Sequence, residues 1–237
     1  MKRFWQQAEI ISAENGFAIG LDGKPLKTPA KAAMVLPSRA LAAMVADEWN
    51  AVEDKLRPED MPATRMANAA IDKVSAQFDE VAQMLAAYGD SDLLCYRATD
   101  PQALVARQRE KWDPLLDWAE AELGARLTPT NGVMPVPQDQ QALDCLRKHV
   151  FALSPFQLSA FHDLVTISGS LVLAFAATKS LLGLEELWSR AILDELWQEQ
   201  QWGEDDEALA LRARKKHDFF HAARFFAFCN QPMDVAT

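Results

Sequence analysis

Hydrophobic and polar positions alternate over short runs at the start of the chain, as they do in half-buried β-strands. Residues 4–11 and 17–21 predict two such strands. Asp22-Gly23 is a strong hairpin-turn signal, so residues 24–28 are expected to form the returning strand. Residues 34–36 are a candidate for a fourth strand. A small antiparallel sheet is therefore predicted at the N-terminus.

A helix is expected to follow this sheet. Ser38 is a favoured N-cap, and apolar residues recur after it at helical spacing. The predicted stripe consists of Leu41, Met44, Val45, Trp49 and Val52. Packing this helix on the sheet would bury the apolar face of both elements, so residues 1–57 predict a small α+β domain.

From residue 58 nearly every segment has helical periodicity. Helices are expected over residues 64–78, 78–88, 101–123, 139–151, 155–167, 169–179, 184–203 and 204–229. Residues 91–97 fit either a helical turn or a short strand, and the Pro/Gly-rich residues 124–138 predict a connection with a short extended pair. Asp113-Pro114 is typical of a new helix start, so a break is expected there. The predicted fold class is α+β, with an all-helical domain over residues 58–237.

The segment 184–203 is unusual because its apolar stripe also carries a charge. It predicts a five-turn helix that ends at Gly203, with Glu195 in the stripe and Gln198 and Glu199 beside it. The opposite side is apolar too, through Leu193, Leu196 and Trp197. A carboxylate on an apolar face is costly unless it is paired or faces a partner. Two interpretations stay open: a buried Glu195 paired with an arginine such as Arg65, Arg97 or Arg107, or a Glu195 that faces another protein.

Composition narrows the class of protein. The chain has 237 residues, 49% of them hydrophobic, and a net charge of −10, which disfavours nucleic-acid binding and, more weakly, anionic membranes. Three cysteines without a CxxC spacing indicate buried thiols in a reducing compartment. The most apolar run, residues 167–177, is too short to span a bilayer, and the N-terminus has neither signal-peptide nor transit-peptide character. We expect a soluble cytoplasmic protein without membrane insertion.

No catalytic or metal motif is complete. His217 and His221 have the spacing of a helical metal pair, but Asp218 replaces the glutamate of HExxH, and the pair lies off the apolar stripe, toward solvent. Ser168 and Ser170 lack the GxSxG pattern of a nucleophile elbow. The glycines near the N-terminus occupy hairpin turns and form no phosphate loop. We expect no metal and no cofactor.

Several stretches together resemble one protein family, the ATP-twelve family of ATP synthase assembly chaperones (assembly factor 2). They are residues 22–29, 48–49, 61–72, 92–97, 107–108, 112–115, 169–171, 194–195 with Gln198, and 202–203. In order and spacing the resemblance runs from about residue 4 to residue 226. It implies a chaperone and not an enzyme, with an N-terminal α+β domain followed by a helical domain. It also implies a bacterial, cytoplasmic member, because the family pattern begins within the first few residues.

The resemblance also implies a partner. Members of this family bind the unassembled alpha subunit of the F-type ATP synthase head and release it when the beta subunit takes over the surface. The candidate partner contacts are Glu195, Asp194, Gln198, Trp202, Trp49, Arg65 and Asn68. Trp49, Arg65 and Asn68 could equally hold the two domains together, and the free protein is expected to be a monomer. Two alternatives stay open: an uncharacterised enzyme with an acidic site around Glu195 and Glu199, and a structural protein whose tryptophans are all core.

Overall fold

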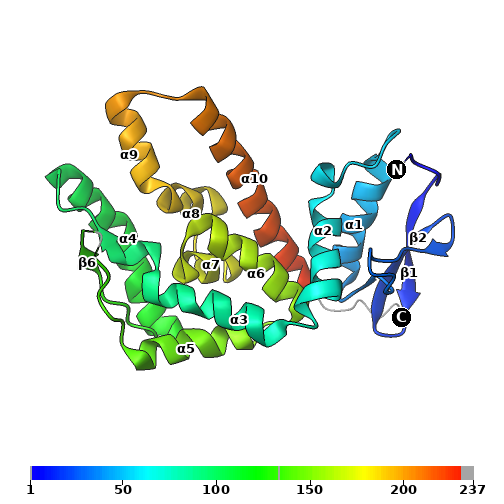
Figure 1. Ribbon diagram of the computed structural model, residues 1–237, viewed down its shortest axis with the longest axis horizontal. Coiled ribbons are helices and arrows are strands. Elements are labelled where there is room, and N and C mark those ends of the chain that lie inside the picture. Colours follow the sequence, from blue (N-terminus) through cyan, green and yellow to red (C-terminus); the bar gives the residue numbers. More distant parts are fainter. Residues whose placement is uncertain (1, 133, 231–237) are drawn as a thin grey trace. The chain divides into compact units, whose positions relative to one another are not determined.

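The computed structural model describes residues 2–132 and 134–230 (Figure 1). The chain forms two compact units. Of the described residues, unit 1 comprises 2–78, 154–160 and 221–230, and unit 2 comprises 79–132, 134–153 and 161–220. The predicted domain boundary between residues 57 and 58 stays a prediction. The α+β class, with a small N-terminal sheet followed by mostly helical chain, is confirmed.

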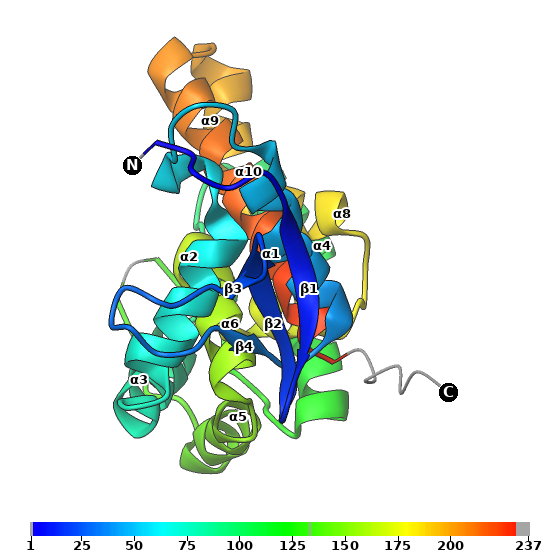
Figure 2. The same ribbon diagram turned by 90° about the vertical axis from the view of Figure 1, so that its right-hand side faces the viewer.

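Unit 1 contains an antiparallel sheet built on β2. The strands are β1 (Ala8–Ala13), β2 (Gly16–Leu21), β3 (Lys24–Pro25) and β4 (Val35–Leu36). β2 pairs with all three others, and every one of its residues is buried. Helix α1 (Arg39–Ala51) packs on β1 and β2, as Figure 2 shows, and Ser38 caps it by accepting a hydrogen bond from the Leu41 N–H at 3.0 Å. The predicted hairpin and N-cap are confirmed.

The first strand begins at Ala8, so its predicted start at residue 4 is wrong. The backbone N–H groups of Gln6 and Gln7 donate to the Asp22 carboxylate and not to a neighbouring strand. The Asn50 side chain binds both the N–H and the C=O of Ala8, at 2.8 and 2.9 Å. Side chains from distant positions thus satisfy backbone groups that would otherwise need a strand partner.

The remaining elements are mostly helices. Unit 1 continues with η1 (Pro58–Asp60), α2 (Pro62–Ala69) and the π-helical turn η2 (Ala70–Val74). Unit 2 contains most or all of α3 (Phe78–Ala86), η3 (Ala87–Ser91), η4 (Leu93–Cys95), β5 (Tyr96–Arg97), α4 (Gln102–Leu123), β6 (Thr130–Asn131), α5 (Gln140–Phe151), α7 (Leu171–Thr178), α8 (Leu184–Ala191) and α9 (Leu193–Trp202). The division between the units falls within α6 (Pro155–Ser168) and α10 (Asp206–Cys229).

The core of unit 2 is organised around α7, whose residues from Leu171 to Ala177 are all buried. It contacts α4 and α8. Residues 91–97 contain both predicted alternatives, a helical turn (η4) and a short strand (β5). The extended pair expected within residues 124–138 is formed instead by β6 with β5, in parallel. None of the helices in the described chain combines the length and apolar character needed to cross a membrane.

The break predicted at Pro114 is wrong, because α4 runs without interruption from Gln102 to Leu123. A proline inside a helix removes one backbone hydrogen bond and strains the turn before it. In α4 apolar residues on both sides of the proline are buried, among them Trp112, Leu115 and Ala119. The burial of this continuous stripe offsets the local cost.

The single helix predicted over residues 184–203 is also wrong, because α8 and α9 are separated at Ile192. The indole N–H of Trp112 donates to the Arg190 carbonyl at 2.9 Å, at the point where one helix would continue into the next. The change of direction buries two consecutive apolar residues, Ile192 and Leu193, on the core side.

Candidate functional site

Helix α9 presents a mixed polar and aromatic face to solvent. Glu195 and Gln198 are exposed, and Trp202, the last residue of the helix, has 79% of its surface exposed. The other side carries Leu193, which is buried, and Leu196 and Trp197, which are half-buried. The apolar residues therefore anchor α9 in unit 2. The stripe predicted over residues 184–203 is divided, because Leu187, Trp188 and Ile192 are buried whereas Glu195 and Trp202 are exposed.

The interpretation of Glu195 as a buried, arginine-paired carboxylate is wrong. Its side chain is exposed. Two of the proposed arginines have other partners in unit 2: Arg97 pairs with Asp113 at 2.7 Å, and Arg107 donates to the Gln200 side chain at 2.8 Å. The third, Arg65, lies exposed on α2 in unit 1. Arg212, which binds Glu199, has a smaller electrostatic interaction with Glu195, and Glu195 forms no ion pair in the described part of the chain.

Polar contacts fix the orientation of α9 against its neighbours. Asp194 accepts a hydrogen bond from the Gln108 amide at 2.8 Å, and the Gln108 carbonyl oxygen accepts one from the Ala98 N–H at the same distance. Gln108 is almost fully buried, so α4 and α9 are joined through a satisfied polar group. Asp194 is thus a positioning residue for the exposed face.

Glu199 and Arg212 join α9 to α10. The guanidinium donates to both carboxylate oxygens, at 2.7 and 2.9 Å. The two side chains are only 19% and 18% exposed. The hydrogen bond with Glu199 raises the pKa of Arg212 above its ordinary value. Glu199, which the sequence places beside Glu195, is therefore occupied within the fold.

The tryptophan predicted as a contact in unit 1 lies in the core. Trp49 is 6% exposed, and its ring lies 4.9 Å from that of Trp5, whose indole N–H donates to the Trp49 carbonyl. Asn68 is half-buried and Arg65 is exposed, both on α2. Their role as partner contacts stays a prediction.

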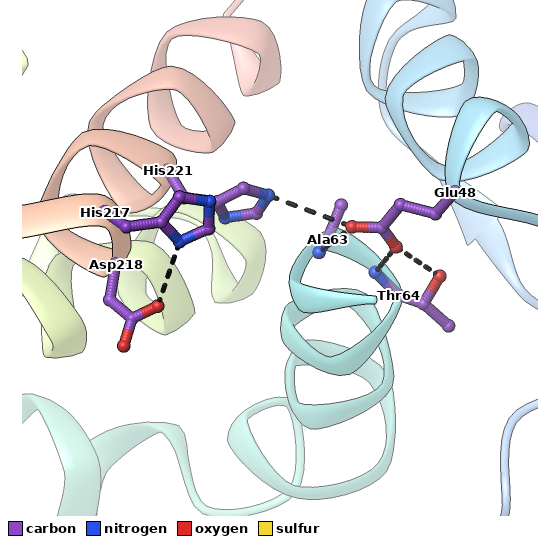
Figure 3. A network of polar contacts seen from close by, with 6 residues as sticks. All are labelled: Glu48, Ala63, Thr64, His217, Asp218 and His221. Carbon is purple, nitrogen blue, oxygen red and sulfur yellow. Dashed lines mark hydrogen bonds and ion pairs between the residues drawn. The ribbon is translucent and has the colours of Figure 1, made fainter. Parts of the chain in front are cut away.

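A second polar network, which the sequence did not indicate, caps α2 (Figure 3). The Glu48 carboxylate accepts hydrogen bonds from the N–H groups of Ala63 and Thr64, at 2.6 and 2.8 Å, and from the Thr64 hydroxyl at 2.7 Å. Burial raises the pKa of Glu48, although these hydrogen bonds oppose the shift. Met61, which precedes α2, makes no capping hydrogen bond with its side chain. The first N–H groups of the helix therefore need an acceptor from elsewhere in the chain, and this missing cap is the signal in the sequence.

The two histidines of the predicted i, i+4 pair have different surroundings. His221, expected to face solvent, is 12% exposed, and its Nε2 lies 3.9 Å from Glu48 Oε1. His217 is exposed beside Asp218. Within the described residues no three His, Cys, Asp or Glu side chains gather as a metal site would require.

Asp92 connects two of the motifs that the sequence singled out. Its buried carboxylate accepts from the N–H groups of Leu94 and Val172, at 3.0 and 3.1 Å, so it caps η4 and the start of α7 together. The Leu93 N–H donates to the Gly169 carbonyl at 3.0 Å. Burial raises the pKa of Asp92 to about 6. These contacts hold η4 against the start of α7, and Asp92, Leu94 and Val172 are buried there.

The chemistry of the α9 face suits recognition better than catalysis. Its Glu195 is exposed to water, whereas carboxylates that transfer protons are usually tuned by burial or a close charge. Glu199 is held by Arg212. An exposed tryptophan beside carboxylates is typical of protein contacts, in which the aromatic ring contributes energy and the charges set the register.

Three comparisons with known proteins agree with one another. A family model described as ATP12 chaperone protein matches residues 2–120. The crystal structure of Atp12 from Paracoccus denitrificans is 46% identical, covers 97% of this chain and 98% of its own, and superposes with a TM-score of 0.93. A variant of that protein, with one aspartate replaced by lysine, gives the same values. Protein atp12, mitochondrial, from Schizosaccharomyces pombe is 26% identical over 219 residues, which is 87% of this chain and 75% of the relative.

Proposed function

Because the chain belongs to the ATP12 chaperone family, we propose that it binds the unassembled alpha subunit of the F-type ATP synthase and shields it until the beta subunit takes its place. An isolated subunit exposes an apolar interface that is normally buried, and such a surface invites aggregation. The observation that carries the proposal for this chain is the exposed α9 face, with Trp202 and Glu195 on a helix fixed by Asp194 and Glu199.

In this proposal Glu195, Gln198 and Trp202 touch the client, and Asp194 positions them. Trp49 supports unit 1 from within, and Arg65 and Asn68 belong to a second candidate contact on α2. We further propose that the protein acts in the bacterial cytoplasm as a monomer when free, without catalytic turnover and without a cofactor. The relative from Paracoccus supports a bacterial setting.

The test is capture of the alpha subunit from a co-expressing strain, first alone and then with the beta subunit. We expect an equimolar complex with alpha that is lost when beta is added. The purified protein is also expected to slow aggregation of isolated alpha. Failure to capture alpha under either condition would contradict the proposal.

The alternative of an enzyme around Glu195 and Glu199 predicts a different result. A Glu195→Gln variant would lose an assayable reaction and keep partner binding. The chaperone proposal predicts the reverse, a variant with weaker alpha binding and unchanged folding. The same variant thus separates the two functions.

A further inference from the structure

The connection between α9 and α10 carries an unusual combination of exposed apolar and acidic side chains. We call it the α9–α10 tip, defined as the exposed residues from Glu195 to Leu211. Trp202 at the end of α9 is 79% exposed, and Leu211, less than two turns into α10, is 49% exposed. Large apolar groups on a monomer surface are common singly, but a pair that flanks one short connection suggests a contact surface.

The charge of this tip has one sign. Residues 193–211 contain seven carboxylates and no lysine, arginine or histidine. Two of the seven are bound within unit 2, Asp194 by Gln108 and Glu199 by Arg212. The five others, Glu195, Glu204, Asp205, Asp206 and Glu207, are exposed, and none forms an ion pair with another residue in the described part of the chain.

Helix capping accounts for only part of this pattern. Asp205 accepts a hydrogen bond from the Ala208 N–H at 2.8 Å, and acidic residues in the first turn of α10 favour its dipole. These effects do not explain why the indole of Trp202 is exposed. They also do not explain the exposed carboxylate of Glu195, which lies seven residues before Trp202 on α9. Nor does the tip contain a cluster of carboxylates arranged for a metal ion, as judged from the described residues.

We infer that the α9–α10 tip docks a segment of the alpha subunit that carries lysine or arginine next to apolar side chains. The inference rests on the proposed function and adds the chemistry of the recognised segment. A cation of such a segment is attracted by the five exposed carboxylates and stacks favourably on an indole, while its apolar neighbours cover Trp202 and Leu211. An acidic segment would be repelled by the carboxylates. A purely apolar segment would remove water from them without offering a partner for their charge.

The test measures the affinity of the full chain for isolated alpha subunit at two salt concentrations. The tip variant combines Glu204→Gln, Asp206→Asn and Glu207→Gln. Its matched control combines Glu80→Gln, Asp117→Asn and Glu122→Gln, three carboxylates that are also exposed in unit 2. A second pair compares Trp202→Ala with Met134→Ala, since Met134 is 74% exposed and lies outside the tip.

We expect the tip variant to raise Kd about tenfold at about 50 mM NaCl, with the difference shrinking at about 300 mM, because salt screens exposed charges. Trp202→Ala is expected to raise Kd about tenfold or more at both salt concentrations. Both controls should stay within about twofold of the unmodified protein. Thermal unfolding of every variant checks that folding is unchanged.

Three outcomes would overturn the inference, and they differ in whether the proposed function also falls. If the unmodified protein binds alpha and the tip variants bind equally well, the docking site is wrong and the proposed function stands. If the unmodified protein fails to bind alpha at all, the proposed function falls and the inference falls with it. Weaker binding by tip variants and controls alike would also count against the tip.

Discussion

The guanidinium of Arg212 binds both carboxylate oxygens of Glu199, and this pair joins α9 to α10. Replacing Arg212 with methionine leaves a mostly buried carboxylate without its two donors. We expect the free energy of unfolding to fall by about 2 kcal/mol, measured by urea denaturation. Arg214→Met is the control on the same helix, because Arg214 is exposed. Equal losses from both variants would show that the pair contributes nothing specific.

Glu195, four residues before Glu199, is expected to behave in the opposite way. Because its side chain is exposed, Glu195→Gln should change the free energy of unfolding by less than about 0.5 kcal/mol. Capture of the alpha subunit should nevertheless weaken. A thermal-unfolding series that includes Glu199→Gln checks this contrast, and a loss of several kcal/mol at Glu195 would restore the buried-pair interpretation.

The cap that Glu48 provides to α2 gives a stability prediction for unit 1. Glu48→Ala leaves the N–H groups of Ala63 and Thr64 without their acceptor, and we expect a loss of about 2 kcal/mol in the free energy of unfolding. Glu53→Ala, which removes an exposed carboxylate from the same unit, should cost little. Hydrogen exchange at Ala63 and Thr64 should accelerate only in the Glu48 variant; unchanged exchange there would contradict the capping role.

Asp92 gives the pH prediction. Burial raises its pKa from 3.8 to about 6 in the folded protein, so between these values the folded state holds a proton that the unfolded state has lost. Its contribution to stability is therefore greatest below the unfolded pKa and declines as pH rises through the folded pKa. Urea denaturation gives the free energy of unfolding of the unmodified protein and of Asp92→Asn at each pH. We expect the value for the unmodified protein to fall by about 3 kcal/mol relative to the variant between pH ~3.5 and pH ~6.5. A constant difference would refute this.

Two glycines of the N-terminal sheet should differ sharply in their tolerance of alanine. Both have positive φ, +149° at Gly16 and +77° at Gly23. A Cβ at Gly16 would collide with the Leu36 carbonyl, whereas a Cβ at Gly23 meets nothing within 4 Å. We expect Gly23→Ala to cost about 1 kcal/mol and Gly16→Ala at least about 3 kcal/mol. Chemical denaturation measures both, and similar losses would contradict the close pairing of β2 with β4.

Local signals in the sequence were sufficient for much of the fold. The Asp22-Gly23 turn and the Ser38 N-cap act through backbone groups within a few residues, so they can be recognised without tertiary information. The resemblance of several stretches to one family supplied the class of function, which the family model and the structural relative from Paracoccus agree with.

The errors at the start of β1 and at Ile192 share one physical cause, because each depends on a group elsewhere in the chain. The Trp112 indole binds the carbonyl of Arg190, 78 positions later, and the predicted helix breaks close by at Ile192. The Asp22 carboxylate accepts hydrogen bonds from the N–H groups of Gln6 and Gln7, and β1 begins only after them, at Ala8. Periodicity describes one segment at a time and carries no information about such partners.

In the candidate site, too, some properties follow from local sequence and others depend on tertiary packing. Helical spacing alone places Glu195, Glu199 and Trp202 on one side of a helix, because residues three, four and seven apart lie on one face. The packing of the folded chain then separates them, since Glu199 is bound by Arg212 while Glu195 and Trp202 remain exposed. That distinction depends on where α10 lies beside α9, and packing between helices is set by all the side chains at their interface together.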